Sequence, residues 1–354
     1  MAYTTIDDPE KHFNTTLYTG TLKDDRPIVG TGFQPDLIWF KNRNTTNQHN
    51  LLDSSRGVTK RIRADDDSAE ATVSTRLKSF DSDGMTISTD PAVNGSGNGI
   101  VAWQWKANGG TTTSNDASVS GVGSLDSVYQ ANTTAGFSIV LYTGSGNAAT
   151  IAHGLGVKPE CILVKNRSKS GGEGWCVYHG ANTSAPETDG IHLNLTNATS
   201  DSTDHWNDQA PTSTTFGISG DDRSGGGYNY VAYVFNSVQG YSKFGGYTGN
   251  GNADGPMVFL GFKPAFLIIK RTDSAKDWYL YDNKRNPLNR HDKVMKPNDS
   301  AAELTTDNYL DFLSNGFKIR GTSSVTNSNN GSYVYMAFAE APFVTSNGTP
   351  GSAR

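Results

Sequence analysis

A proline-led apolar phrase occurs three times in this chain, and the residues around it stay in register. It reads GFQPDLIWFKNR from residue 32, GVKPECILVKNR from residue 156 and GFKPAFLIIKR from residue 261. Upstream, Gly20, Gly144 and Gly249 end the sequences LYTG, LYTG and GYTG, each 12 positions before the first glycine of the phrase. Because chance would not preserve both the phrase and its flanks, the chain is three versions of one unit of about a hundred residues.

The downstream part of the unit also repeats, most closely in the first and third copies. LLDSSRG (51–57) corresponds to LYDNKRN (280–286), and SFDSDGMTI corresponds to DFLSNGFKI. The second copy diverges in this middle region and carries the insert DSTDHWNDQAP (201–211). All three copies end on an apolar run, namely GIVAWQWK, NYVAYVF and SYVYMAF.

The phrase predicts a strand that is covered on both faces. Pro35, Pro159 and Pro264 suit the entry of a strand, because proline fixes φ and has no N–H to donate. The residues that follow each proline are apolar at successive positions, as in a buried strand, and the lysine at 41, 165 or 270 marks the return to water.

Short runs rich in Val, Ile, Tyr, Phe and Thr, separated by Gly, Asn, Asp and Ser, predict further strands and tight turns. We therefore expect an all-β protein of three tandem jelly-roll-like β-sandwiches. Helix signals are scarce, and the best candidates begin at Ser68 and Ser300, where Ser300 and Glu303 resemble a capping box.

The predicted divisions follow the repeats. They are an N-terminal arm (1–13), repeat 1 (14–107), a Gly/Ser/Thr linker (108–136), repeat 2 (137–239), repeat 3 (240–343) and a C-terminal tail (344–354). The linker is small and polar, which predicts that the first unit can swing relative to the second.

Charge and composition exclude several classes of function. The net charge is −5 and no basic stripe is present, which argues against nucleic acid as a partner. The opening MAYTTIDDPEKHF lacks the features of a signal peptide, and no apolar run approaches a membrane span, so we expect synthesis in a cytoplasm and no membrane insertion. Cys161 and Cys176 are then expected as reduced core residues, although a disulfide stays open as an alternative.

The search for chemistry finds no reaction centre, so we expect no enzyme, no cofactor and no metal. The histidines have no zinc-like spacing, and no phosphate loop or G-x-S-x-G elbow occurs. NGNADG (250–255) alternates acids and amides like a calcium loop, but its twelfth position is Gly261 and not Glu, so a plain loop is expected. The pair Asp53 and Arg56 recurs as Asp282 and Arg285, which we interpret as an exposed loop brace that adds little stability.

Trp206 is the one surface-contact candidate. It lies among polar residues in the divergent insert, where it could stack on a sugar or touch a partner. Packing of the indole onto its own sheet is the alternative reading.

The motifs AYTTIDDP, LYTG, GFQPDLIWFKNR, LLDSSRG, SFDSDGMTI and VAWQWK resemble a domain family of virion proteins in marine tailed bacteriophages, including cyanophages and phages of SAR11-type bacteria. The likeness covers almost the whole chain, and family members carry the unit singly or in tandem. The resemblance implies a structural role without catalytic residues, and localisation in the virion.

Three roles follow as hypotheses. In the first, the chain is a tail-associated fibre or adhesin, a homo-oligomer such as a trimer. An N-terminal arm with Tyr3, Ile6 and Phe13 as apolar anchors then docks on other virion proteins, and the distal units contact a host glycan or protein. The second role is a capsid decoration protein, and the distant third is a glycan depolymerase, which would need a pair of carboxylates in a groove.

Overall fold

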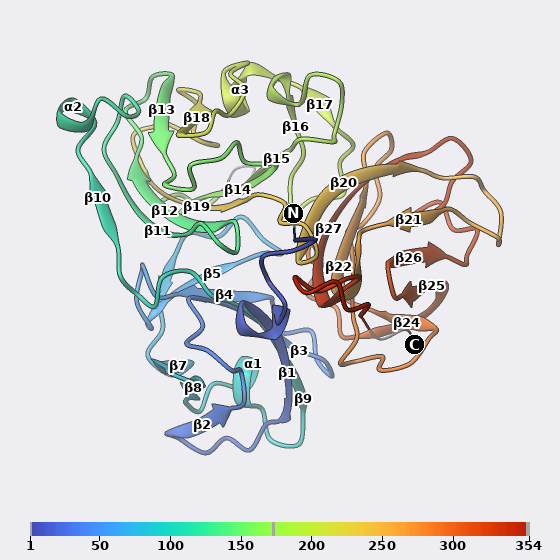
Figure 1. Cartoon of the computed structure of the whole chain (residues 1–354). Coiled ribbons are helices and arrows are strands. Elements are labelled where there is room, and N and C mark those ends of the chain that lie inside the picture. Colours follow the sequence, from blue (N-terminus) through green and yellow to red (C-terminus); the bar gives the residue numbers. More distant parts are fainter. Residues whose placement is uncertain (1, 172–173, 352–354) are drawn as a thin grey trace.

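The computed structural model describes residues 2–171 and 174–351. The chain is all-β, and its few helices are single turns. Figure 1 shows three lobes arranged around a centre, where the N-terminus lies. The short helices are η1 (Pro9–Lys11), α1 (Pro91–Asn94), α2 (Ala117–Ser120), η2 (Pro186–Thr188) and α3 (Thr203–Trp206).

Each unit contains one large antiparallel sheet with the same strand order. The first strand of the unit pairs with its last strand, the last pairs with the proline-led strand, and that strand pairs with the next one along the chain. In the first unit the order is β1 (Phe13–Thr19), β9 (Gly99–Trp105), β3 (Leu37–Asn42), β4 (Asn50–Asp53), β5 (Lys60–Arg63) and β6 (Ala71–Thr72). In the second it is β10 (Thr113–Asn115), β11 (Ser127–Asn132), β12 (Phe137–Thr143), β19 (Asn229–Phe235), β14 (Cys161–Asn166) and β15 (Trp175–His179). In the third it is β20 (Ser242–Thr248), β27 (Ser332–Pro342), β22 (Phe262–Arg271) and β23 (Tyr279–Asp282).

A smaller sheet belongs to each unit and packs against one face of the large sheet, so that every unit has its own core. The smaller sheets are β2 (Arg26–Val29), β8 (Gly84–Ile87) and β7 (Leu77–Asp81); β13 (Ala149–Ala152) and β18 (Thr215–Ile218); and β21 (Met257–Phe259), β26 (Gly316–Ile319), β25 (Leu304–Leu313) and β24 (His291–Val294). The pair β16 (Asp189–Gly190) and β17 (Ser200–Asp201) lies in the divergent part of the second unit.

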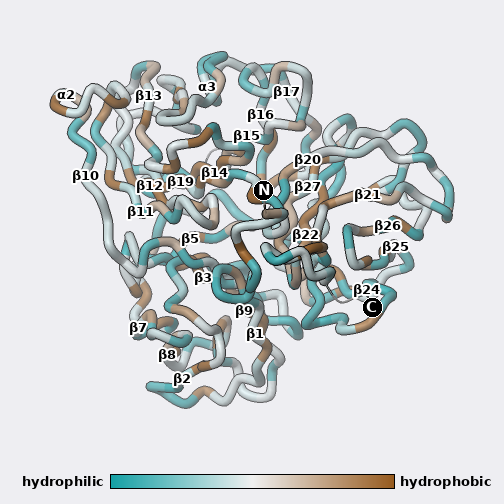
Figure 2. Tube along the Cα trace, viewed as in Figure 1, coloured by the Kyte–Doolittle hydropathy of each residue, from teal (hydrophilic) through white to brown (hydrophobic). Residues whose placement is uncertain are grey.

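The other face of each large sheet meets the other two units in a shared central core. The ring of Phe338, from the third unit, lies 5.1 Å from that of Phe13 and 5.7 Å from that of Trp105, both of the first unit. It also lies 6.0 Å from the ring of Phe235 in the second unit. In Figure 2 hydrophobic stretches recur along β14, β15, β22 and β27, where the lobes meet.

This arrangement explains why the proline-led strands are apolar on both faces. Ile38 and Phe40 face the core of the first unit, whereas Leu37 and Trp39 face the central core. The prediction of a strand covered on both sides holds, because each face meets a different hydrophobic layer.

The predicted return to water at the lysines is wrong. Lys41, Lys165 and Lys270 are all 0% exposed, and burial lowers the pKa of each ammonium group to about 8. The Lys41 ammonium donates to four carbonyl oxygens at 2.7–3.1 Å, one of them that of Ser300 in the third unit. Lys270 likewise donates to the carbonyl of Thr196 in the second unit, so two of these lysines bridge units.

The segment expected to be a swinging linker is ordered against the second unit. β11 pairs with β12 over six residues and extends the second large sheet. The Asp36 carboxylate of the first unit accepts hydrogen bonds from the backbone N–H groups of Ala107, Gly109 and Gly110 at 2.7–2.9 Å. The side-chain amide of Gln130 also donates to Ser54, so both ends of this segment are bound to the first unit.

The helices expected at Ser68 and Ser300 do not form. Residues 68–70 and 300–303 are irregular, and their acidic residues bind the neighbouring unit instead of capping a helix. Glu70 N–H donates to the Arg167 carbonyl and Glu303 N–H to the Arg43 carbonyl, each at 2.8 Å.

We predict that replacing Phe338 by Ala destabilises the whole molecule. The side chain is 1% exposed and contacts all three units, so its loss leaves a cavity that costs about 3–5 kcal/mol of unfolding free energy. Urea denaturation followed by tryptophan fluorescence and circular dichroism measures this loss, and we expect one transition with both probes.

The control is Val119→Ala, because Val119 is 82% exposed and its truncation should leave stability unchanged. A Phe338→Ala protein in which two units keep wild-type stability would contradict a shared core.

Candidate functional site

A buried ionic cluster lies where the first and second units meet. The Arg56 guanidinium donates to Asp53 Oδ2 at 2.6 Å, and the Tyr233 hydroxyl of the second unit donates to the same oxygen at 2.7 Å. Glu70 contacts Arg56 at 3.0 Å and Arg167 of the second unit at 2.8 Å. The side chains of Asp53 and Arg56 are 0% exposed.

An equivalent cluster lies where the third and first units meet. The Arg285 guanidinium donates to Asp282 Oδ2 at 2.5 Å, and the indole N–H of Trp103 in the first unit donates to the same oxygen at 3.0 Å. Glu303 contacts Arg285 at 3.1 Å and Arg43 of the first unit at 2.8 Å. Each residue has its counterpart in the cluster between the first and second units.

The junction between the second and third units has a neutral set of residues at the same places. His179 replaces the aspartate, and its Nε2 lies 3.0 Å from the Tyr335 carbonyl of the third unit. Asn182 replaces the arginine, and its side-chain oxygen accepts a hydrogen bond from the Thr199 hydroxyl at 2.7 Å. Met336 stands at the position that Tyr233 and Trp103 occupy in the other two units. This junction therefore lacks both the aspartate and the side chain that donates a hydrogen bond to it.

The interpretation of the Asp–Arg pairs as exposed braces is therefore wrong. The pairing within the loop is present, but the charges are buried and lie between units. Sequence reasoning missed Glu70, Glu303, Tyr233 and Trp103 as partners. A signal was available, because the second copy loses the Asp–Arg pair while the third copy has methionine where the others have tyrosine or tryptophan.

The electrostatics of these clusters suit structure and not proton transfer. Burial alone raises the pKa of Glu70, but Arg167 and Arg56 outweigh burial and lower it overall. Burial lowers the pKa of the Arg56 guanidinium, yet Asp53 and Glu70 outweigh it and raise that pKa. Both groups are held in their charged forms, far from the near-neutral pKa of a general acid or base.

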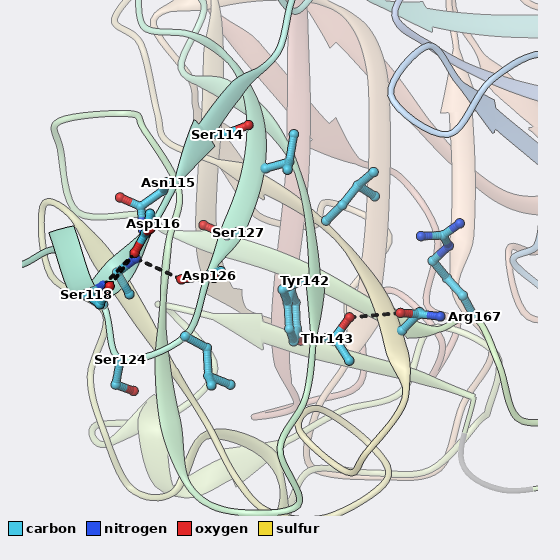
Figure 3. A pocket seen from close by; sticks show the side chains of 16 residues that line it. Ser114, Asn115, Asp116, Ser118, Ser124, Asp126, Ser127, Tyr142, Thr143 and Arg167 are labelled. Atoms are coloured by element: carbon cyan, nitrogen blue, oxygen red, sulfur yellow. Dashed lines mark hydrogen bonds between the residues drawn. The ribbon is translucent and has the colours of Figure 1, made fainter. Parts of the chain in front are cut away.

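A hollow of about 850 Å³ lies on the second lobe, between α2, β10, β11 and β12 (Figure 3). The acidic residues that line it accept hydrogen bonds from the backbone of the surrounding loop. Asp116 accepts hydrogen bonds from the N–H groups of Ser118 and Val119 at the start of α2, and Asp126 accepts one from Ala117. The hollow can admit a ligand, but the hydrogen bonds of its acidic residues give it no evident chemistry.

The remaining lining residues agree with this description. Arg167 is held by two hydrogen bonds to Glu70, and Tyr142 is 5% exposed, so its ring offers no open stacking face. Among the described residues no group of three or more His, Cys, Asp or Glu side chains is placed to bind a metal ion.

The proposed docking arm folds onto its own chain. Phe13 begins β1 and is 1% exposed in the central core, and Ile6 is 2% exposed in the same core. The Tyr3 hydroxyl donates to the Gly261 carbonyl at 2.9 Å. The apolar anchors were recognised, but their partner is the third unit and the central core of this molecule.

Trp206 is not a surface residue. It lies in α3 and is 1% exposed, and its indole N–H donates to the Asp189 carbonyl at 3.1 Å. Its ring meets Tyr178 edge to face at 5.8 Å. The alternative reading, packing onto its own sheet, is the one the structure shows.

The two cysteines are buried, and no disulfide joins them. Cys161 faces the central core and Cys176 faces the core of the second unit, on opposite sides of the same sheet.

The NGNADG segment forms a loop whose Asn250 contacts Asn327, and Asp254 pairs with Lys318 at 2.7 Å. These contacts agree with the expectation of a plain loop at NGNADG.

A family model described as Domain of unknown function (DUF7483) matches residues 8–342. The chain belongs to this family. No curated protein matches it. In the described part of this family member, no helix has the length and apolar character needed to cross a membrane.

We predict that Arg285→Asn costs about 3–5 kcal/mol of unfolding free energy, because it leaves the buried Asp282 without its partner. The matched variant adds Asp282→His, Glu303→Thr, Trp103→Met and Arg43→Thr. These changes copy the neutral junction of this same chain, where Thr199 N–H donates to the Thr272 carbonyl as Glu303 N–H donates to the Arg43 carbonyl. The fivefold variant should recover most of the loss in urea denaturation. If it is no more stable than the single variant, the two kinds of junction are not interchangeable.

The neutral junction also predicts a pH dependence. Burial lowers the pKa of His179 to about 4 in the folded state, below the ordinary value of 6.5. The neutral imidazole therefore contributes fully to folding stability above pH 6.5, and this stability is lost as pH falls toward 4. That difference corresponds to a loss on the order of 3 kcal/mol. Wild type should lose stability relative to His179→Gln between pH 7 and pH 4.5 in urea titrations.

The comparison with the variant is needed because other groups titrate in the same range. Burial raises the pKa of Asp65 to about 7, which stabilises the fold as pH falls through that value and so acts in the opposite sense. A constant difference between wild type and His179→Gln across this range would contradict the assignment to His179.

Proposed function

We propose that this chain is a structural protein of a tailed-bacteriophage virion, exposed on the particle, where it contributes to host attachment as a tail-associated protein. The resemblance of its repeated motifs to virion proteins of marine phages supports this role. We further propose that its three units are jelly-roll-like sandwiches. The common strand order of the three large sheets, each with a smaller sheet against it, supports that assignment.

The observation that carries the proposal is the shared central core. The apolar faces of the three units pack together in this core, and the charged groups at two junctions pair across the units. A protein built in this way acts by presenting surface, and repetition of one unit multiplies weak contacts. No enzymatic role is included in the proposal.

The shared core changes the form of the proposed attachment protein. A linear fibre with a docking arm at one end does not fit, because Tyr3, Ile6 and Phe13 lie against the other units. One chain already supplies three units around a centre, which is the arrangement that a homotrimer of single units would have. We therefore propose a compact head, whose partners are other virion proteins on one side and a host glycan or protein on the other.

Capsid decoration is the alternative, and copy number separates the two roles. Quantitative mass spectrometry of purified virions, with known tail and capsid proteins as internal standards, should give a copy number set by tail symmetry. A copy number that follows the capsid lattice would favour decoration. Absence of the chain from purified virions would overturn both.

A further inference from the structure

The outer strand of each smaller sheet occupies the same position in the three units, and these strands are β2, β13 and β21. In the third unit, Ile319 N–H donates to the Pro256 carbonyl and Leu260 N–H donates to the Asn315 carbonyl. Alternation along an antiparallel pair then directs the N–H and C=O of Val258 toward β26. The backbone groups of Met257 and Phe259 consequently point away from the sheet.

The second unit covers the equivalent edge with its own chain. The N–H groups of Ser124 and Leu125 donate to the Thr150 carbonyl at 2.9 and 3.3 Å, and Thr150 N–H donates to the Ser124 hydroxyl at 2.9 Å. Leu125 forms a parallel bridge with Ile151. This edge is therefore closed by added extended chain.

In the first unit, a proline at an outward position protects the edge strand β2. Its register places Pro27 and Val29 in the outward positions, opposite Thr86 and Gly84. Pro27 has no N–H, and proline is one of the ways by which native proteins block pairing at an exposed edge.

The third unit has neither protection. Pro256 stands one position too early to remove an outward N–H, and the outward residues are Met257 and Phe259. These two residues are 41% and 52% exposed. The Lys243 ammonium donates to the Phe259 carbonyl at 2.8 Å, and a carbonyl oxygen can still accept a second hydrogen bond.

We propose that β21 is a dimerisation edge, on which β21 of a second copy of this chain pairs antiparallel about a two-fold axis at Val258. In this register Met257 lies opposite Phe259 of the partner subunit. Each outward N–H then meets an outward carbonyl, giving four hydrogen bonds across the axis. The two four-stranded sheets would join into one continuous sheet.

A second copy fits because the edge is complementary to itself. Methionine opposite phenylalanine brings a thioether beside an aromatic ring on the exposed face, on both sides of the axis. The residues from Pro256 to Leu260 carry no charge, so pairing opposes no like charges on the strands themselves. The proposal does not depend on a virion role, since it follows from the edge alone.

Sedimentation velocity of the full chain over a wide concentration range tests the proposal. We expect a reversible monomer–dimer equilibrium, which Met257→Lys with Phe259→Lys weakens at least tenfold in Kd because it places like charges opposite each other. Val29→Lys is the matched control at the equivalent outward position of the first unit and should leave Kd unchanged. Circular dichroism and the thermal midpoint establish that each variant is folded.

A second measurement locates the contact. Hydrogen exchange of a peptide spanning Met257 and Phe259 should slow as concentration rises through Kd, whereas a peptide spanning β2 should not change. A wild-type chain that stays monomeric at its highest soluble concentration would overturn the proposal. So would a dimer that the double lysine variant leaves intact, or one whose protected amides lie outside β21.

Discussion

The second face of the three large sheets is the constraint on which the rest of the structure depends. A sandwich needs only one apolar face per sheet, yet Leu37, Trp39, Phe266 and Ile268 turn large side chains away from their own unit. Burying such a side chain stabilises the fold by about 1.5–3 kcal/mol, and leaving it in water forfeits that amount. A single unit would therefore expose a broad apolar face. The three units fold around one another because each supplies the cover that the others lack, which agrees with a family match that spans residues 8–342 as one segment.

Charged residues at the junctions complement this apolar packing. Burying an ion pair brings little net stability, because desolvation offsets the attraction. Two junctions nevertheless carry the buried Asp–Arg and Glu–Arg pairs, whereas the third carries His179, Asn182 and Met336. The three apolar faces come from corresponding strands of the repeat. Two ionic junctions and one neutral junction make the order distinct, because a wrong pairing would bury Asp53 or Asp282 without a donor across the junction.

The strands and the repeat could be predicted from the sequence. Which layer covers the second face of each strand could not. Apolar residues at successive positions predicted that the proline-led strands are buried on both sides, and they are. The same pattern cannot say whether the second layer is another sheet of the unit or another unit. Three of the corrected predictions follow from this gap. Lys41 seemed to reach water, Asp53 and Arg56 seemed to brace a surface loop, and Phe13 seemed free to dock, whereas each lies against a neighbouring unit. Such long-range contacts leave only a paired signal in the sequence, such as methionine and histidine appearing together at one junction.

Once the faces are buried, the edges are what distinguish the units. The sheets of the three lobes share one strand order, and their cores are built from similar residues, so neither can give a unit an individual role. The edges differ in kind: Pro27 blocks one, residues Ser124 and Leu125 cover another, and β21 presents Met257 and Phe259. An edge contact is specified by backbone register and a few side chains, so it can change in one copy without disturbing the shared core. The proposed dimer contact accordingly lies at the rim of one lobe, where the copies differ, and not at their common centre.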